Sequence, residues 1–567
     1  MDQPGSPSFH RYSSEVSRRG AKGIAPIVFI IGAAIVILAT AVVGTYVFLD
    51  SANHPNDETA SYLPADTDIY FSLNLRPGAE QLQYVRRIIS RYTDNPDFQD
   101  KVDDLVDTVE DETGIHLLKD VLPWLGPELA IGLIDVGGIA DNPQVVAFVG
   151  TRDTEAAERV LRRFLDSLEE EEEAGFREGS YKGFITFREV DEEEVNLAIT
   201  DNYLVFATSE RLLEDTIDMM EESVDALSDK AEFKEARDSV MEERFSFLYV
   251  DVESIVRQFR VVASAAGAGE ALREVEDRLP EILGVSGSFV DRGVRIDGYY
   301  NTPPGSNIIP PANSLGSAGL LPDDSLAFLS ATGLKEALQE ALTELEEDTT
   351  LGFDIQEILE GLDQGFSIDI DRDILGWMTG EVAIALLPNS FSSDIFGGLS
   401  RAIHALALFQ FEERGDTEDA LENLVDALEN LGVPFDDVEI EGEKATMVDL
   451  RGFFGETAYK PGFMFLGNYL VLGTTDLALS MAVSARDGDE PSLSNAEEFS
   501  RVVEMAPEGK NALFFLNLKE IVKAALDAQS PSEREDYREN AAPFVDPLRA
   551  FLVGMETTSF TLVITIE

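Results

Sequence analysis

The sequence predicts an α+β protein in which one unit of mixed helix and strand occurs twice. Two observations lead to this prediction: five sequence segments recur in the same order, and each copy alternates amphipathic helices with short apolar strands. Several strands follow one another closely enough to form hairpins, which favours largely antiparallel sheets with helices packed on one side. We therefore expect two tandem duplicated α+β domains.

The duplication is seen in five pairs of segments that keep their order along the chain. LPADTDIYFSLNL at 63–75 returns as LPDDSLAFLSATGL at 321–334, and DNYLVFATSERLL at 201–213 returns as GNYLVLGTTDLAL at 467–479. The other pairs are 123–133 with 376–386, 153–168 with 416–431, and 231–256 with 496–522. Five collinear matches do not arise by chance, so we infer a tandem duplication.

Short runs rich in apolar and β-branched residues predict the strands. In the first copy NLAITDNYLVFAT indicates two strands around Asp201 and Asn202. In the second copy GFMFLGNYLVLGT indicates the same arrangement around Gly467 and Asn468. These residue pairs tolerate the positive φ that a tight hairpin turn needs, so a hairpin is predicted at both places.

Amphipathic helices are predicted between the strands, most clearly over 153–168 and 416–431. In both segments the apolar residues fall on one helical face, and an Asp or Thr stands at the start as a cap. The two faces consist of Ala156, Val160, Leu161, Phe164, Leu165 and Leu168 in the first copy and of Ala420, Leu421, Leu424, Val425, Leu428 and Leu431 in the second.

The stretch from Ile24 to Leu49 predicts a single transmembrane helix. Its 26 residues carry no charge, and such a helix crosses a hydrocarbon core roughly 30 Å thick. Basic residues precede the span and acidic residues follow it, which places the N-terminus in the cytoplasm and the bulk of the chain outside the plasma membrane. A cleaved signal peptide is the alternative, but its apolar region would be shorter, roughly 7–15 residues, and no small-x-small cleavage site precedes Asp50.

Composition shifts set the expected boundaries around this span. The segment after 300 is rich in Pro, Gly, Ser and Asn, a composition typical of linkers. We expect a cytoplasmic tail at 1–23, the membrane span at 24–49, a polar stalk at 50–62, the first repeat at 63–300, a linker at 301–320 and the second repeat at 321–567.

The chain is strongly acidic, with 108 Asp and Glu against 43 Lys and Arg and a formal net charge of −65. Such a surface repels phosphate, so nucleic-acid binding is excluded. Two explanations of the acidity stay open: adaptation to concentrated salt, whose counter-ions screen the repulsion, and the binding of cations such as calcium by clustered carboxylates. Cysteine is absent, which removes disulfides and thiolate metal sites.

The two tryptophans of the chain, Trp124 and Trp377, occupy matching positions in the two copies. A large ring at such a junction either anchors a core or closes a ligand pocket, and anchoring is the more usual role. Each tryptophan stands between an Asp and a Glu, which are Asp120 and Glu128 in the first copy and Asp373 and Glu381 in the second. Two such carboxylates can serve acid–base chemistry only where the turn folds them together; otherwise they are a capping Asp and an edge Glu.

At this junction the sequence resembles a family. The LPADT-type strand opening, the D-x-L-P-W-L-G-x-E junction and the NYLV hairpin are similar to the bacterial membrane-anchored family catalogued as domain of unknown function 3352. The second copy departs from the junction pattern, with Gly376 in place of Pro123 and Met378-Thr379 in place of Leu125-Gly126. The resemblance covers most of 63–567 and implies an anchored extracytoplasmic protein, without catalytic residues to carry over.

One run of acidic residues and two histidines bear on metal binding. Asp369, Asp371 and Asp373 form a D-x-D-x-D run, but an EF-hand needs Gly and an acid where Ile374 and Gly380 stand. Neither His116 nor His404 has a second histidine at ligand spacing, which argues against zinc. The chain also lacks the G-x-S-x-G, phosphate-loop and H-E-x-x-H motifs. We therefore assign no catalytic, cofactor-binding or metal-binding residue, and calcium remains an alternative.

The function predicted from these observations is that of a non-catalytic module, anchored in the membrane, that binds an envelope protein partner or has a structural role. Two alternatives remain open. One is a carboxylate-dependent envelope hydrolase of polar polymers, which would require two acids with raised pKa values in one pocket. The other is a carrier of apolar ligands in a groove between sheet and helix.

Overall fold

A computed structural model describes residues 57–567 apart from Pro77, most positions from 94 to 113, and several internal segments. These segments are 137–143, 171–174, 191–194, 223–224, 266–278, 302–309, 348–368, 389–402 and 451–458. The predicted membrane span at 24–49 lies outside the described residues. Within the described part of the chain, no helix combines the length and the apolar character that crossing a bilayer requires.

Within the described residues, twenty strands form one antiparallel sheet that runs through both copies. In the first copy their spatial order is β4 (Phe176–Tyr181), β5 (Phe184–Glu189), β6 (Asn196–Ile199), β7 (Tyr203–Ala207), β3 (Gln144–Thr151), β2 (Leu125–Asp135), β1 (Ile69–Asn74), β8 (Ser246–Asp251), β9 (Ile282–Val290) and β10 (Gly293–Tyr300). The antiparallel α+β fold expected from the hairpins is thus confirmed.

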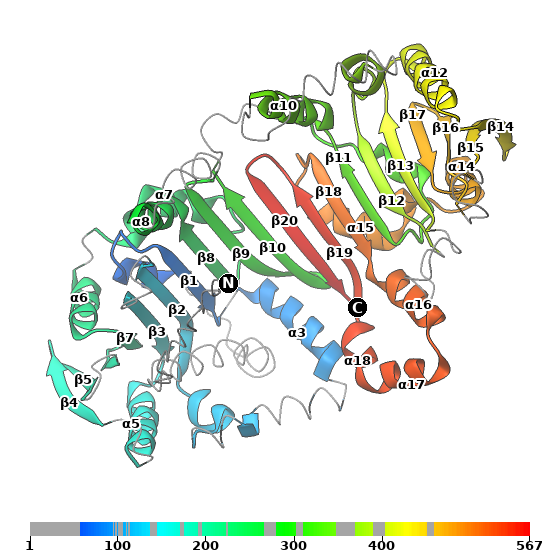
Figure 1. Ribbon diagram of the computed structural model, residues 1–567. Helices are drawn as coiled ribbons and strands as arrows, with labels where there is room; N and C mark the ends of the chain where they lie inside the picture. The colour runs from blue at the N-terminus through cyan, green and yellow to red at the C-terminus, as the bar shows by residue number, and fades with distance from the viewer. Residues whose placement is uncertain are drawn as a thin grey trace, which may run out of the picture.

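The second copy repeats this order strand for strand. Its strands are β14 (Phe435–Ile440), β15 (Glu443–Val448), β16 (Gly462–Leu466), β17 (Tyr469–Gly473), β13 (Ala405–Gln410), β12 (Val382–Leu386), β11 (Ala327–Ala331), β18 (Ala512–Asn517), β19 (Leu548–Met555) and β20 (Ser559–Ile566). The two copies meet where β10 pairs with β20, the last strand of each (Figure 1). Tandem units therefore share one sheet.

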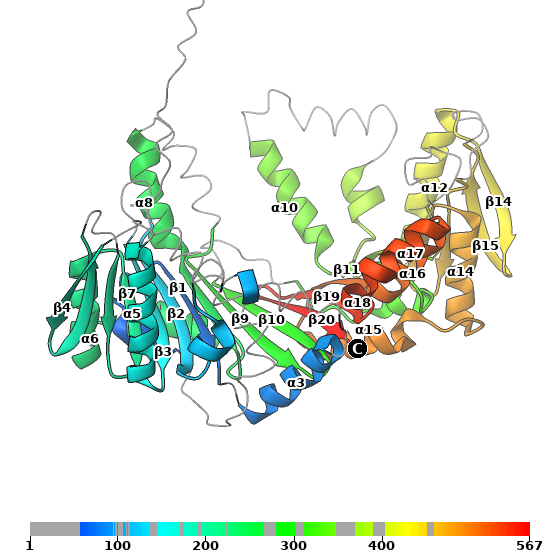
Figure 2. The same cartoon turned by 90° about the horizontal axis from the view of Figure 1, so that it is seen from below.

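Helices cover both faces of this sheet, not one face as the sequence suggests. On β2 the neighbours Leu129 and Ala130 are both buried, but they belong to different apolar clusters. α3 (Ala79–Thr93) packs into the cluster of Leu129, and α10 (Leu334–Glu347) packs against the matching cluster of the second copy; both are seen with α8 (Val252–Ala265) in Figure 2. The physical reason is that the central strands are apolar on both faces, and such strands need cover on each.

One face is covered by α6 (Glu210–Glu221) and α7 (Ala231–Asp238) in the first copy and by α14 (Asp476–Asp487) and α15 (Glu497–Met505) in the second. The other face carries the predicted amphipathic helices, which are α5 (Thr154–Glu170) and α12 (Arg414–Asn430). Three further helices of the described structure follow β18: α16 (Leu518–Ala528), α17 (Pro531–Asn540) and α18 (Ala542–Val545).

Matching caps show how local sequence starts equivalent helices in the two copies. The Ser209 hydroxyl accepts a hydrogen bond from the Leu212 N–H at the start of α6, and Thr475 accepts one from the Ala478 N–H at the start of α14. Each hydroxyl satisfies a backbone donor that the first helical turn leaves open.

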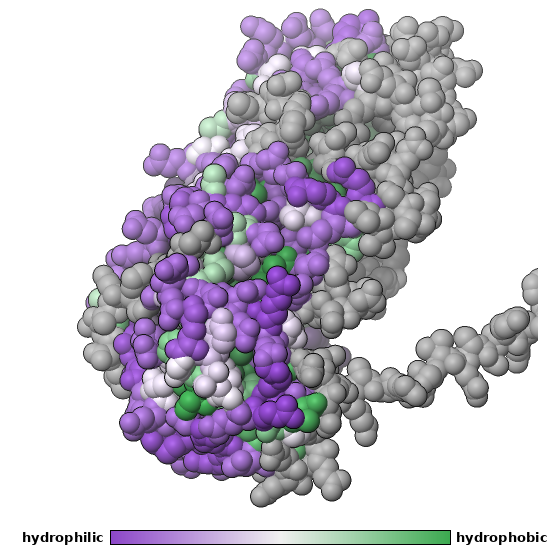
Figure 3. All heavy atoms as spheres, turned by 90° about the vertical axis from the view of Figure 1, so that its left-hand side faces the viewer, coloured by the Kyte–Doolittle hydropathy of each residue, from purple (hydrophilic) through white to green (hydrophobic). Residues whose placement is uncertain are grey.

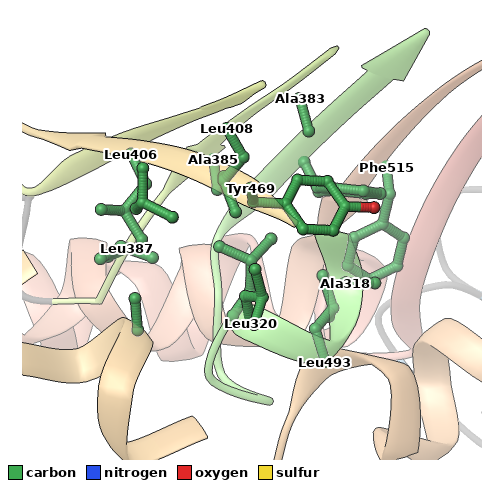
Figure 4. Close-up of a cluster of buried hydrophobic side chains, with 14 of the residues drawn as sticks. Ala318, Leu320, Ala383, Ala385, Leu387, Leu406, Leu408, Tyr469, Leu493 and Phe515 are labelled. Carbon is green, nitrogen blue, oxygen red and sulfur yellow. The ribbon is translucent and has the colours of Figure 1, made fainter. Parts of the chain in front are cut away.

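The core of the second copy is shown in Figure 4. Tyr469 lies in the middle of a cluster to which Ala383, Leu408 and Phe515 contribute from three different strands, and Ala318 from a short helical segment. Alternate residues of each strand point into this cluster, as the two-residue period of a strand requires. Both copies therefore contain a packed apolar core.

Two short helical turns that the sequence assigned to connecting segments are part of the fold. One is η2 (Glu58–Tyr62), placed in the stalk at 50–62, and the other is η6 (Gly316–Leu320), placed in the linker at 301–320. Both are preceded by a residue with positive φ, 62° at Asp57 and 55° at Leu315. Because η2 and η6 pack into the two cores, each repeat begins earlier than its expected boundary.

Candidate functional site: matched buried carboxylates

The Asp of each junction caps a single wide helical turn. These turns are η3 (Leu117–Val121) and η7 (Ile370–Leu375). Asp120 accepts a hydrogen bond of 3.0 Å from the His116 N–H, and Asp373 accepts one of 2.9 Å from the Asp369 N–H. The Asp therefore holds the start of the turn in both copies, by bonding the backbone of the residue that precedes the turn.

Arginine completes the environment of each capping Asp. Hydrogen bonds from Arg372 at 2.6 and 2.8 Å hold the pKa of Asp373 down at about 2. At Asp120 partial burial opposes the shift, yet the His116 N–H and Arg163 keep the pKa of the carboxyl below its usual value. Both groups are thus ionised anchors at neutral pH.

Both junction tryptophans are buried, as expected of core anchors. Trp124 is 4% and Trp377 is 8% exposed, and each belongs to the apolar cluster on the α5 or α12 side of the sheet. The Trp377 indole N–H donates to the Asp373 carbonyl at 2.9 Å. The tryptophan thus packs beneath the turn that the Asp caps.

Glu128 lies on the opposite side of the sheet from Trp124, only 2% exposed. Its carboxylate accepts hydrogen bonds from three hydroxyls: Thr59 at 2.9 Å, Tyr70 at 3.2 Å and Tyr203 at 3.3 Å. Burial, opposed by these hydrogen bonds and reinforced by the nearby charge of Asp57, raises the pKa of Glu128 to about 7.

An ion pair stands beside this carboxylate. The Arg244 guanidinium donates to Asp57 at 2.5 Å, and the Ser72 hydroxyl donates to the other oxygen of Asp57, also at 2.5 Å. Arg244 and Asp57 are 6% and 7% exposed. A pair this deep depends on both partners, because either charge alone would be buried without compensation.

Glu381 is the second-copy counterpart of Glu128 and is 1% exposed. It accepts hydrogen bonds from the Ser317 N–H at 3.0 Å, from the Ser317 and Ser330 hydroxyls at 2.6 Å, and from the Tyr469 hydroxyl at 2.7 Å. Burial and then the contact with Glu381 raise the pKa of Tyr469 well above its usual range, which keeps it a donor.

The two networks use the same positions. Thr59 corresponds to Ser317 and Tyr203 to Tyr469, so in both copies the Glu ties a short helical turn to a hairpin strand. The second copy has Leu315 at the position of Asp57. There Asn313 supplies a polar partner instead, and its amide donates to the Ser330 hydroxyl at 2.7 Å.

The structure does not bring Asp120 and Glu128 together. Asp120 bonds His116 and Arg163, whereas Glu128 bonds hydroxyls on the other face of the sheet. Neither buried Glu stands at a sheet edge, so the edge interpretation is wrong for both. Sequence reasoning missed the hydroxyl donors because Thr59 and Ser317 fell in the expected stalk and linker. Extending the repeat match upstream, from ETASYLP to GSAGLLP, would have found both.

No metal centre appears among the residues that the structure describes, where no three acidic or histidine side chains converge. Asp369 caps η7 by accepting from the Arg372 N–H at 2.9 Å, and the side chain of Asp371 lies outside the described atoms. His404 bonds Thr475 at 2.8 Å, and burial lowers its pKa. His116 lies 3.9 Å from Glu110.

The surface around these networks is polar. On the side of the molecule shown in Figure 3, the end that carries β4 and α6, hydrophilic residues dominate and apolar spots are small and separate. This distribution is that of a solvated exterior.

Comparison with known proteins adds a family. The search of curated proteins gave no match. Among solved structures, crystal form III of TP0453 is similar at 9% identity and a TM-score of 0.24, over 45% of this chain and 83% of that one. Crystal form I of TP0453 is similar at 8% identity and a TM-score of 0.24, over 45% and 81%. A TM-score this low does not show a shared fold. Residues 30–559 match the family described as protein of unknown function (DUF3352), to which this chain therefore belongs.

Proposed function

We propose that this chain is a membrane-anchored extracytoplasmic protein whose two joined units bind a protein partner at the cell envelope without catalysing a reaction. The main support is the state of Glu128 and Glu381, the carboxylates that acid–base chemistry would need. They are 2% and 1% exposed, and hydroxyls of their own fold fill their hydrogen-bonding positions. A general acid or base must reach a proton of its substrate, which such burial prevents.

The shape of the sheet also supports a binding role. Twenty strands in one sheet make an extended body, and the strands at its two ends, β4 and β14, each pair on one side only within the described structure. A long body with open edges offers a large surface to a partner.

The proposal includes a membrane anchor formed by Ile24–Leu49. Ile24–Leu49 is apolar and uncharged, and the family match begins at residue 30, inside this stretch. Cell fractionation tests it: the full chain should sediment with membranes, and a chain starting at Asp50 should not. In intact spheroplasts, added protease should degrade the acidic bulk of the full chain. A bulk that stays protected would contradict the extracytoplasmic placement.

The binding role is tested by cross-linking in cells. A photoreactive residue placed at exposed positions on β4, β14 and the helices should give a discrete cross-linked product at some positions and none at others. The absence of any discrete product would contradict the proposal. So would turnover of a polar polymer by the purified chain that disappears in Glu128→Gln or Asp120→Asn.

A further inference from the structure

A pocket of about 440 Å³ opens on the second copy, between the β14–β15 hairpin and the first turn of α14. Its floor is apolar, with Ile440 and Met447 from the hairpin. Its charged lining is mainly acidic, with Asp436, Asp449 and Asp476 beside the single lysine Lys460. An apolar floor with a mainly acidic lining suits a ligand with an aliphatic stem and a cationic end.

The first copy shows what occupies the equivalent position there. The β4–β5 hairpin matches the β14–β15 hairpin residue for residue: Arg177 faces Arg188 as Asp436 faces Met447. Both hairpins also turn through residues of positive φ at the same two positions, 48° and 92° in the first copy and 48° and 86° in the second. Arg188 is therefore the counterpart of Met447.

Arg188 carries an alkyl stem that ends in a guanidinium, and this guanidinium forms an ion pair with Glu210. Glu210 is the first residue of α6, just as Asp476 is the first residue of α14. The first copy thus supplies from its own chain a cation for the acid at the helix start.

In the second copy no arginine stands at this position. Met447 is uncharged, and it lies so close to Gly462 that a Cβ there would collide with its sulfur. Asp476 pairs instead with Lys460 at 2.9 Å, and both side chains are more than half exposed. An exposed pair of this kind is weak and gives way readily to a better-placed cation.

We propose that this pocket binds an arginine side chain presented by an extended segment of a partner protein. The alkyl stem of this arginine packs on Ile440 and Met447. Its guanidinium pairs with Asp476 in place of Lys460, as the Arg188 guanidinium pairs with Glu210. Two further features favour a polypeptide as the source of this arginine. β14 lines the pocket and has an open edge in the described sheet, where an extended segment can pair. The acidic chain also attracts basic partners. The inference rests on the proposed binding function and names the chemistry of the partner.

Calorimetry at low ionic strength tests the inference on the full chain in detergent. The probes are the blocked peptide acetyl-Thr-Val-Arg-Val-Thr-amide, the same peptide with norleucine for arginine, and agmatine as a free alkyl guanidinium. We expect saturable binding of the arginine peptide at one site, with at least tenfold weaker binding of the norleucine peptide and of agmatine. Equal binding of the norleucine peptide, or no binding of the arginine peptide, would overturn the inference. Agmatine as tight as the peptide would show a small cation as ligand and reject the protein source.

The duplication supplies matched variants. Met447→Arg should place a guanidinium beside Asp476, as Arg188 does beside Glu210, and should weaken binding at least tenfold. Where Met447→Arg disturbs folding, Asp476→Asn should weaken binding tenfold and Lys460→Gln should tighten it severalfold. Unchanged affinity in Asp476→Asn would refute the site. A partner cross-link in cells that persists in Met447→Arg would leave the binding function standing while rejecting this pocket.

Discussion

The Thr561 hydroxyl on β20 donates a hydrogen bond of 2.6 Å to the Asp297 carboxylate on β10, across the strand pair that joins the two copies. Thr561 is 1% and Asp297 is 7% exposed. The Arg295 guanidinium donates hydrogen bonds of 2.7 to 2.9 Å to the same carboxylate. The contact between the copies is therefore a buried, fully bonded part of one sheet.

The first prediction concerns this junction. Thr561→Val leaves Asp297 without one of its donors and should lower the free energy of unfolding by about 1–3 kcal/mol. Urea denaturation followed by circular dichroism measures the change. Ser559→Ala on the same strand is the matched control, because Ser559 bonds Glu556 on its own hairpin, and it should have less effect. Equal stability of Thr561→Val and the parent chain would mean that the bond contributes nothing to the junction.

The second prediction uses the natural difference between the copies. Asp57→Leu introduces at position 57 the leucine that the second copy has at position 315. It leaves the buried Arg244 without its carboxylate partner. The loss should be roughly 3–5 kcal/mol, since an unpaired buried charge is costly. The double change Asp57→Leu with Arg244→Lys copies the pair Leu315 and Lys510, in which the lysine donates to the Pro507 carbonyl. The double variant should therefore be more stable than Asp57→Leu alone. Losses of unfolding free energy that simply add for the two substitutions would contradict this.

Much of the fold follows from local pattern. The hairpins around Asp201-Asn202 and Gly467-Asn468 and the helices at 153–168 and 416–431 depend on periodicity over a few residues, and all four form. The turn chemistry was only half predicted: Gly467 adopts a φ of 62°, whereas Asp201 and Asn202 close their turn without positive φ. The pairing of β10 with β20 joins residues more than 250 positions apart, and no local pattern encodes such a contact.

The candidate site was harder to predict than the fold. The match of Glu128 with Glu381 is visible in the sequence, but their burial is not, because a Glu on a strand is usually exposed. What makes burial tolerable is a set of hydroxyls from distant segments, Thr59 and Tyr203 in the first copy among them. Their convergence depends on the three-dimensional arrangement of η2, β2 and β7.

The third prediction separates the two explanations of the acidity. Thermal unfolding of residues 50–567 across a sodium chloride series should show a melting temperature that rises smoothly, because counter-ions screen the repulsion among surface carboxylates. Millimolar calcium at fixed ionic strength should add nothing, since the described residues hold no converging set of ligands. A saturable rise at low calcium would reveal a specific site, and loss of that rise in Asp369→Asn would place it.

The fourth prediction is the pH dependence that Glu128 gives to stability. Its pKa is about 7 in the folded chain, against about 4.3 for an unfolded glutamate. Between these two values the folded state binds more protons than the unfolded state, so the free energy of unfolding falls as the pH rises. The contribution is fully present below about pH 4 and lost above about pH 7, and it amounts to about 4 kcal/mol.

Glu128→Gln resembles the protonated acid and cannot ionise, so its stability relative to the parent chain should rise between pH 5 and pH 8 by about 3 kcal/mol. Urea denaturation of both chains at several pH values measures this difference directly. Glu381→Gln is the matched control: its amide oxygen cannot accept from the Ser317 N–H and three hydroxyls at once, so this variant should be destabilised instead. A Glu128→Gln curve that runs parallel to that of the parent chain over this range would show that Glu128 is already ionised in the folded core.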